Sequence, residues 1–172
     1  MSKRNKNSVL LAVIFTIMIV AICVLIVAYS KADEPTTMYV VNAHNVSINV
    51  RHNPSTRSDI VGRLEFGWDV EVVESKKIKG VQWYKVNGVS EYGYGWVIGY
   101  YLINSEPERV KDVKGTVNAN GRVATYSKIN GSRKSWAKPK ETLDVSVYSN
   151  EWCYTNKGWI KTEYLAIDGK EE

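Results

Sequence analysis

The sequence predicts an all-β protein in which two small modules follow one N-terminal transmembrane helix. The first observation is a repeated eight-residue pattern: Gly-Trp, a β-branched residue, three variable residues and Tyr-Leu, at 95–102 and again at 158–165. Self-similarity of this kind indicates a domain that is present twice. The second is that short β-branched and aromatic segments alternate with turn residues from Tyr39 onward, without a sustained helical period. The third is one long apolar run, at 9–29.

The apolar run is the first element of the chain, and only Thr16 within it is markedly polar. At about 1.5 Å per residue, a helix over 9–29 spans the roughly 30 Å hydrocarbon core of a bilayer. The preceding residues, 1–8, are basic and contain no acid. Because excess Lys and Arg mark the cytoplasmic flank of a span, we expect a cytoplasmic tail at 1–8, a transmembrane helix or signal anchor at 9–29, and the modules outside.

A polar spacer is expected at 30–37. An alternative is that the N-terminal segment is a signal peptide and the protein is secreted after cleavage near Ala32. Ser30 and Ala32 are small enough for a signal peptidase, but the apolar core of a signal peptide is usually only about 7–15 residues long. The run at 9–29 therefore favours a retained anchor.

The first module is expected at 38–104. Asn87 and Gly88 form the strongest short hairpin signal within it, because both residues tolerate the positive φ of a type I′ turn. Its expected strands are 46–50, 60–64, 70–73, 83–86 and 95–98.

The second module is expected at 115–168, after a linker at 105–114 that is rich in charge and has little to bury. Its expected strands are 122–126, 142–148, 151–155 and 158–160. Each module is close to the lower size at which a domain folds without disulfides or metals. A small twisted sheet that closes on itself is the expected architecture, because closure removes exposed edges.

Composition fits an exported binding protein. The net charge is +5 and the isoelectric point is about 9.1. Of the two cysteines, Cys23 lies in the apolar run and Cys153 in the second module, so they are not expected to pair. Cys153 stands between two aromatic residues in an expected strand, which favours a small buried core residue.

The first module resembles the bacterial SH3 (SH3b) family. The residues that carry the resemblance are Ile48-Asn49-Val50-Arg51, Asn53-Pro54-Ser55, Ile60-Val61-Gly62-Arg63-Leu64, Trp83-Tyr84-Lys85-Val86 and the pattern at 95–102. The second module resembles a divergent member: it keeps the pattern at 158–165 and Trp152, but has Arg122-Val123-Ala124-Thr125-Tyr126-Ser127 in place of the first signature.

The resemblance implies two small SH3-like β-barrels that serve outside the cell as binding modules. Modules of this family are often attached to cell-wall hydrolases, where they recognise peptidoglycan or its cross-bridges. Four tryptophans of the matching motifs are expected to pack inside the barrels rather than contact ligand: Trp83, Trp96, Trp152 and Trp159.

Six residues of the first module are candidates for ligand binding: Asn53, Arg57, Trp68, Tyr92, Tyr94 and Tyr100. Exposed Tyr and Trp side chains on a glycine-rich segment form a rigid contact surface at little entropic cost. The alternative is that these aromatic residues merely cover the open end of the barrel.

A second candidate surface lies within 128–140, which is basic and has a tryptophan in its middle. A flexible basic loop of this kind would attract anionic wall polymers or lipid headgroups. The alternative is a solvated loop without specificity, and export argues against nucleic acid as a partner. The proposed contact residues are Lys128, Arg133, Lys134, Trp136 and Lys138.

Signals of catalysis are weak. His44 and His52 lie in the first module, apart from Cys153, so no nucleophile pair is expected. Two histidines without a Cys-x-x-Cys motif do not make a metal site, and no cofactor motif occurs. We therefore expect a non-catalytic, membrane-anchored extracellular protein whose modules recognise peptidoglycan or an associated anionic wall polymer. The alternative function is a scaffold that docks another exported protein, such as a wall hydrolase, at the membrane.

Overall fold

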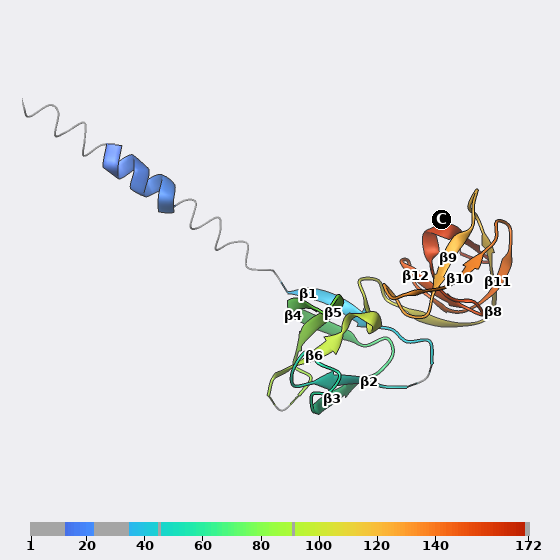
Figure 1. Cartoon of the computed structure of the whole chain (residues 1–172), viewed down its shortest axis with the longest axis horizontal. Coiled ribbons are helices and arrows are strands. Elements are labelled where there is room, and N and C mark those ends of the chain that lie inside the picture. Colours follow the sequence, from blue (N-terminus) through green and yellow to red (C-terminus); the bar gives the residue numbers. More distant parts are fainter. Residues whose placement is uncertain (1–12, 23–34, 45, 91, 171–172) are drawn as a thin grey trace, which may run out of the picture. The chain divides into compact units, whose positions relative to one another are not determined.

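The computed structural model describes residues 13–22, 35–44, 46–90 and 92–170 (Figure 1). The chain divides into two units, Met1–Glu34 and Pro35–Glu172. In the first unit, 13–22 is an exposed helix. No helix among the described residues has both the length and the apolar character needed to cross a membrane. The predicted tail at 1–8, most of the spacer, the rest of the predicted span and the cleavage site near Ala32 lie outside the described residues.

The first module is one seven-stranded antiparallel sheet with the strand order β3-β2-β6-β5-β4-β1-β7. A 3₁₀ helix, η1 (Gly99–Tyr101), lies between β6 and β7. The strands are β1 (Thr36–Val40), β2 (Ile48–Arg51), β3 (Ile60–Leu64), β4 (Asp69–Ile78), β5 (Val81–Asn87), β6 (Tyr94–Ile98) and β7 (Leu102–Ile103).

The second module repeats this arrangement in the order β10-β9-β13-β12-β11-β8-β14. Each strand occupies the place of its counterpart in the first sheet, and η2 (Thr162–Tyr164) corresponds to η1. The predicted β architecture of the two modules and the repeat are thereby confirmed. The strands are β8 (Glu108–Val117), β9 (Val123–Tyr126), β10 (Arg133–Ala137), β11 (Thr142–Tyr148), β12 (Trp152–Thr155), β13 (Gly158–Lys161) and β14 (Leu165–Ile167).

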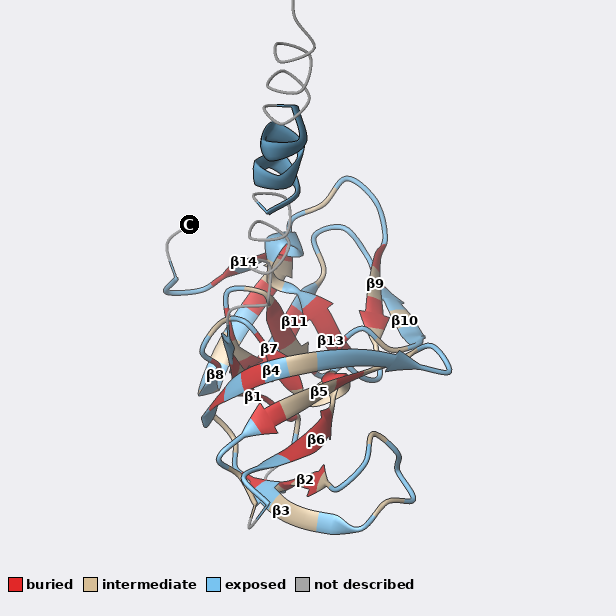
Figure 2. Ribbon diagram, turned by 90° about the vertical axis from the view of Figure 1, so that its left-hand side faces the viewer, coloured by how far each residue is buried: buried red, intermediate tan, exposed pale blue. Residues whose placement is uncertain are grey.

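Strict alternation of apolar and polar residues builds these sheets. In β11, Leu143, Val145 and Val147 are buried while the residues between them are exposed, as the two-residue period of a strand requires. The first residues of β4 alternate in the same way, since Val70 and Val72 are buried between exposed residues. The last residues of β4, from Ser75 to Ile78, are all exposed, and Figure 2 shows this change from red to pale blue bands along the strand.

Each sheet curls around its own core. Leu64 of β3 and Leu102 of β7 come from the two ends of the first strand order, yet both belong to one cluster of buried side chains. The same holds for Ala137 of β10 and Leu165 of β14 in the second module. Among the described strands, the hydrogen-bonded order is open between its two end strands, so packing rather than pairing closes each sheet.

The predicted linker at 105–114 is largely strand. β8 pairs with β11 from Glu108 to Thr116 and with β14 near its end. Its charged residues are exposed while Val110 and Val113 pack on the second core, so the charge that suggested a linker is the polar side of a strand. Asp112, with φ of 57°, lies at the irregularity in register between β8 and β11.

The glycine that opens each repeated motif allows a close approach between strands. A Cβ atom at Gly95 would overlap the Val50 side chain of β2. A Cβ atom at Gly158, where φ is +117°, would lie 2.6 Å from the carbonyl oxygen of Tyr126 in β9. The motif thus requires glycine because the neighbouring strand occupies the space of a side chain.

We expect Gly95→Ala and Gly158→Ala to lower the free energy of unfolding by about 1–3 kcal/mol each, as overpacked substitutions do. Urea unfolding followed by tryptophan fluorescence measures the change. The matched control is Gly121→Ala, where no atom lies within 4 Å of the added Cβ, with an expected change within about 0.5 kcal/mol. Equal stability of all three variants would contradict the packing role.

A third cluster of buried side chains contains residues of both modules. Val41 and Ile103 come from the first module, and they pack with Ile129, Val147, Trp152 and Trp159 of the second. Val41, Ile129 and Val147 are fully buried. Because this buried cluster takes members from both modules, the two sheets share part of their core.

Polar contacts border this shared cluster. The Arg109 guanidinium donates to the Asn42 side-chain oxygen at 3.0 Å and to the His44 carbonyl at 3.2 Å, and lies 4.2 Å from the centre of the Phe66 ring. The Asn104 amide donates to the Glu151 carboxylate at 3.2 Å. These contacts fix the orientation of the two modules around the apolar cluster.

The shared cluster predicts that the modules unfold together. We expect Ile103→Ala to cost about 2–5 kcal/mol and to speed amide hydrogen exchange in both sheets. Exchange measured at Val97 and Ile160, one core residue in each module, checks this. Ile60→Ala, at a residue 48% exposed, is the matched control. Faster exchange in the first sheet alone would refute the coupling.

Candidate functional site

A groove of about 240 Å³ opens on the first module. It lies along β2 and η1, and the loop between β2 and β3 contributes Thr56. Its lining combines aromatic, polar and basic side chains without an acidic residue among those described. The lining residues include Asn49, Arg51, Thr56, Trp83, Tyr100 and Lys128.

Arg51 is held at the groove by the loop that follows it. Its backbone pairs with Trp96 of β6, and its guanidinium donates to the Ser58 carbonyl at 2.7 Å. Ser58 in turn accepts the Asn53 amide on its hydroxyl at 2.9 Å. The loop is therefore cross-linked at its base, and the predicted contact residues Asn53 and Arg57 are exposed on it.

Tyr100 is half-buried in η1 and forms one wall of the groove. The Lys128 ammonium of the second module lies 5.1 Å from the centre of its ring, within the range of a cation–π contact. The neighbouring Tyr101 packs on the core of the first module. Both tyrosines of the 3₁₀ turn are half-buried and line the groove.

The six predicted binding residues do not all meet in this groove. Of the six, Tyr100 alone is among the residues that line the groove. Tyr94 lies at the opposite end of β6, under the Lys85 ammonium at 4.0 Å, and Tyr92 packs edge-on against His52 with ring centres 5.3 Å apart. Trp68, 52% exposed, precedes Asp69 at the start of β4.

Tyr94 and Trp68 lie at the same end of the sheet. Tyr94 pairs with Asn87 of β5, and the Asn87 amide donates to the Glu71 carboxylate in β4 at 2.8 Å. Trp68 comes just before that part of β4. The predicted set therefore divides into a groove containing Tyr100 and a separate exposed aromatic end.

The second module has a groove of about 300 Å³ at the corresponding place, along β9 and next to η2. Lys161 and Tyr164 occupy the motif positions of Ile98 and Tyr101, while Glu163 stands where the first module has Tyr100. The Glu163 carboxylate beside Tyr164 raises the pKa of that tyrosine. The remaining lining residues include Arg122 and Tyr126. The two grooves share a position but differ in chemistry.

The predicted basic loop is more ordered than its composition suggests. Residues 133–137 form β10, which pairs with β9, and the Arg133 guanidinium lies 4.6 Å from the centre of the Trp136 ring. Lys134 and Lys138 are exposed. Alternation explains the strand, because Ala137 is buried and Ser135 half-buried while Trp136 between them is exposed.

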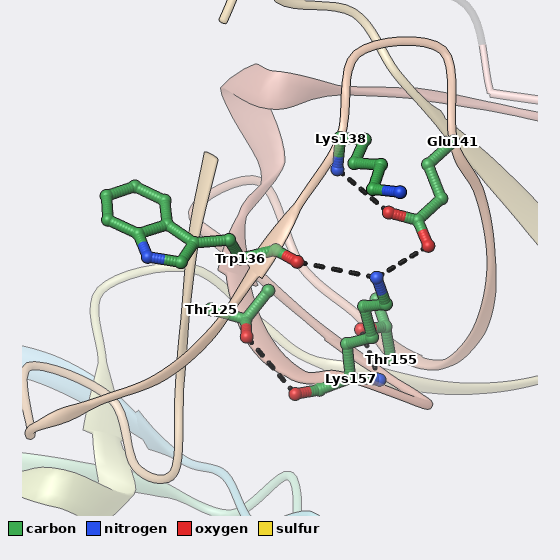
Figure 3. A network of polar contacts seen from close by, with 6 residues as sticks. All are labelled: Thr125, Trp136, Lys138, Glu141, Thr155 and Lys157. Atoms are coloured by element: carbon green, nitrogen blue, oxygen red, sulfur yellow. Dashed lines mark hydrogen bonds and ion pairs between the residues drawn. The ribbon is translucent and has the colours of Figure 1, made fainter. Parts of the chain in front are cut away.

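An acidic residue organises the turn after β10 (Figure 3). The Glu141 carboxylate pairs with the Lys157 ammonium at 2.5 Å and accepts the Lys138 amide at 2.8 Å. Lys157 also donates to the Trp136 carbonyl at 3.4 Å. The hydrogen bond from Lys157, followed by that from the Lys138 amide, lowers the pKa of Glu141. Glu141 lies just beyond the acid-free window of 128–140, so composition within that window did not reveal it.

The four motif tryptophans are buried, each at most 5% exposed. Although all four are buried, their neighbouring residues differ. Trp159 belongs to the cluster shared by the modules, whereas its counterpart Trp96 lies beneath the Lys76 ammonium at 4.9 Å from the ring centre.

Neither His44 nor Cys153 belongs to a metal-binding group among the described residues. The ring of His44 packs edge-on against Tyr154, with ring centres 6.0 Å apart. Within the described part of the chain, no group of three or more His, Cys, Asp and Glu side chains could hold a metal ion. Cys153 is fully buried, with its sulfur 3.3 Å from the Thr162 hydroxyl.

A family model described as the bacterial SH3 domain matches residues 46–103. Residues 46–103 form a bacterial SH3 domain. The predicted resemblance is thus confirmed for the first module, and the second module is a similar β-sheet with the same strand order. Two residues of the groove that sequence reasoning did not select for binding, Arg51 and Thr56, lie within this SH3 domain.

Solved structures give distant similarities to both modules together. The CBD of the endolysin LysPBC5 has 12% identity and a TM-score of 0.33, over 81% of this chain and 98% of that one. NlpC1 and NlpC2 from Trichomonas vaginalis have 10% and 11% identity, TM-scores of 0.32 and 0.30, and coverage of 82% and 77% of this chain. The chain spans about half the length of each NlpC protein, 49% and 48%. A search of curated proteins found no match.

Burial raises the pKa of the Cys153 thiol, although hydrogen bonding to Thr162 opposes the shift. In a Cys23→Ser background, we expect Cys153 to react with a thiol reagent no faster than the protein unfolds. Reaction rates measured with and without urea check this. Labelling of the native protein at the rate of an exposed thiol would contradict it.

The raised pKa also sets a direction for stability against pH. A group whose folded pKa exceeds its unfolded value contributes fully below the unfolded pKa, about 8.5 for a thiol, and the contribution is lost as the pH rises through the folded value. We expect the stability difference between the native chain and Cys153→Ala to shrink between pH 7 and pH 10, as urea titrations would show.

Proposed function

We propose that this protein binds the bacterial cell wall through its SH3 domain, each module being a small SH3-like barrel. The observation that carries the proposal is the open groove on residues 46–103, lined by aromatic, polar and basic side chains. The SH3b family that the first module resembles provides extracellular modules that recognise peptidoglycan or its cross-bridges. Peptidoglycan is the ligand we assign first.

The composition of the groove suits such a ligand. The peptide stems and sugars of peptidoglycan present amide, hydroxyl and carboxylate groups to a binding site. Tyr100 supplies aromatic surface, Asn49 and Thr56 supply hydrogen-bonding groups, and Arg51 supplies a cation. Concave sites of this kind usually combine apolar walls with a few well-placed polar groups.

The proposed role is non-catalytic and extracellular. The basic start of the chain and the apolar run at 9–29 support a protein that is exported and held at the membrane with its N-terminus in the cytoplasm. Secretion after cleavage near Ala32 is the alternative. The mass of the mature protein, compared with 19.5 kDa for the whole chain, distinguishes the two. A cleared zone in a wall zymogram would argue against the non-catalytic role.

The exposed cations at and just after β10 support a contribution of the second module to the binding of anionic wall polymers. Arg133, Lys134 and Lys138 are exposed there beside the half-exposed Trp136 ring. Contacts of this kind are screened over about 10 Å at 0.1 M salt. Wall association that weakens in moderate salt would support this contribution.

Pull-down of the full chain on purified cell walls, in mild detergent, tests the main proposal. We expect Tyr100→Ala to weaken binding about tenfold, the effect of a contact worth about 1.4 kcal/mol. The double variant Trp68→Ala and Tyr94→Ala tests the exposed aromatic end in the same assay. Tyr164→Ala removes a tyrosine of the second groove, at the motif position of Tyr101, and is expected to retain most of the binding.

The outcomes separate the alternatives. Undiminished binding by folded Tyr100→Ala would exclude the groove, and loss in the double variant alone would move the site to the aromatic end. Failure of the native chain to bind purified walls, with capture only when exported proteins are added, would support the scaffold function instead. Unchanged melting temperatures establish that each variant is folded.

A further inference from the structure

We propose that Lys128 of the second module completes the groove of the SH3 domain, forming a two-cation site for the carboxylate of a wall peptide. The inference rests on the proposed function and names the ligand group that the groove takes. It also gives the second module a part in recognition, because that module supplies one side of the first module's site whether or not it binds a ligand of its own.

The position of Lys128 is the first step. Its side chain lines the same groove as Arg51, and its ammonium lies 5.1 Å from the centre of the Tyr100 ring. No acidic side chain lines this groove among the described residues. Two cations thus face one concave surface that carries no compensating charge.

The second step is what holds Lys128 there. The next residue, Ile129, is fully buried in the cluster shared with Val41 and Ile103 of the first module. The Lys128 carbonyl also accepts the Gly131 amide at 3.0 Å, which closes a tight turn. Because Ile129 is fixed between the modules, the backbone of Lys128 is fixed relative to η1.

The third step is that Lys128 is available to a ligand. Some lysines of this module are paired with acids: Lys157 pairs with Glu141, and Lys170 pairs with Glu108. Within the described part of the chain, Lys128 forms no ion pair, and its described contact is with an aromatic face. A cation–π contact leaves the ammonium able to donate to an anion.

The fourth step is the identity of the anion. Arg51 uses one guanidinium nitrogen on the Ser58 carbonyl, and the planar group retains further donors in a fork that matches a carboxylate. An extended polyphosphate would be matched by a long row of cations, whereas this groove offers two. Hydroxyl and amide groups of Thr56 and Asn49 accompany them, as the backbone of a peptide requires. A single peptide carboxylate fits best.

The test uses the full chain in mild detergent and soluble muropeptides, released from purified walls by a muramidase, as the probe. We expect Lys128→Glu to weaken binding about tenfold or more and Lys128→Met to weaken it less, by titration calorimetry. The matched control is Lys111→Glu, the same charge change at an exposed residue of β8, with an expected affinity within about twofold of the native value.

A second arm tests the carboxylate. Muropeptides whose carboxylates have been converted to amides should bind the native chain as weakly as native muropeptides bind Lys128→Glu, and the two changes together should cost little more than either alone. Inorganic phosphate is the third probe. Phosphate binding as tight as that of muropeptides, with the same dependence on Lys128, would overturn the carboxylate assignment.

The failures of the two proposals are distinguishable. If the native chain binds muropeptides, Tyr100→Ala weakens binding and Lys128→Glu does not, the groove stands and the role of Lys128 falls. If the native chain binds neither walls nor muropeptides, the proposed function falls and this inference with it. Ile129→Ala gives an independent readout: we expect it to reduce affinity in the same direction, because it frees the turn that carries Lys128.

Discussion

Burial of Trp152 and Trp159 against Val41 and Ile103 is the contact on which the arrangement of this protein depends. Each tryptophan removes roughly 150–250 Å² from water on burial, and residues of both modules form the cluster that buries them. The two copies of the repeat are therefore not structurally independent domains. In the second copy, the motif residue Trp159 packs in the cluster shared with the first module. The corresponding residue of the first copy, Trp96, is buried beneath Lys76 of its own module.

The two copies have consequently diverged around a common sheet. The first keeps a tyrosine at position 100 in η1 and an open groove, whereas the second has Glu163 at that motif position. Downstream of β9, the second module places Ile129 in the shared cluster and Lys128 beside Tyr100. In the proposed function, the first copy carries the recognition surface, and the second fixes and extends it.

Local sequence signals predicted the parts of the structure that local physics determines. Alternation in 142–148 and the repeated Gly-Trp motif identified strands, copies and buried tryptophans. The same signals failed at 108–114, because charge on one side of a strand resembles a linker when the partner strand is unknown. The proximity of Lys128 to Tyr100 has no local signature at all, since it arises from packing between residues far apart in the chain. Tyr94 and Tyr100 were divided for a different reason: β6 is an extended strand, and they lie at its two ends.

The place of β1 in the first sheet has a consequence for how the SH3 domain is delimited. The family match begins at residue 46, yet β1 (Thr36–Val40) lies between β4 and β7 and pairs with both. A fragment cut at the family boundary would lack an interior strand, and it would leave β7 with no neighbour in the described sheet. The recognisable family signature is thus shorter than the smallest piece of chain able to complete this sheet, and the missing strand is the segment nearest the apolar N-terminal run.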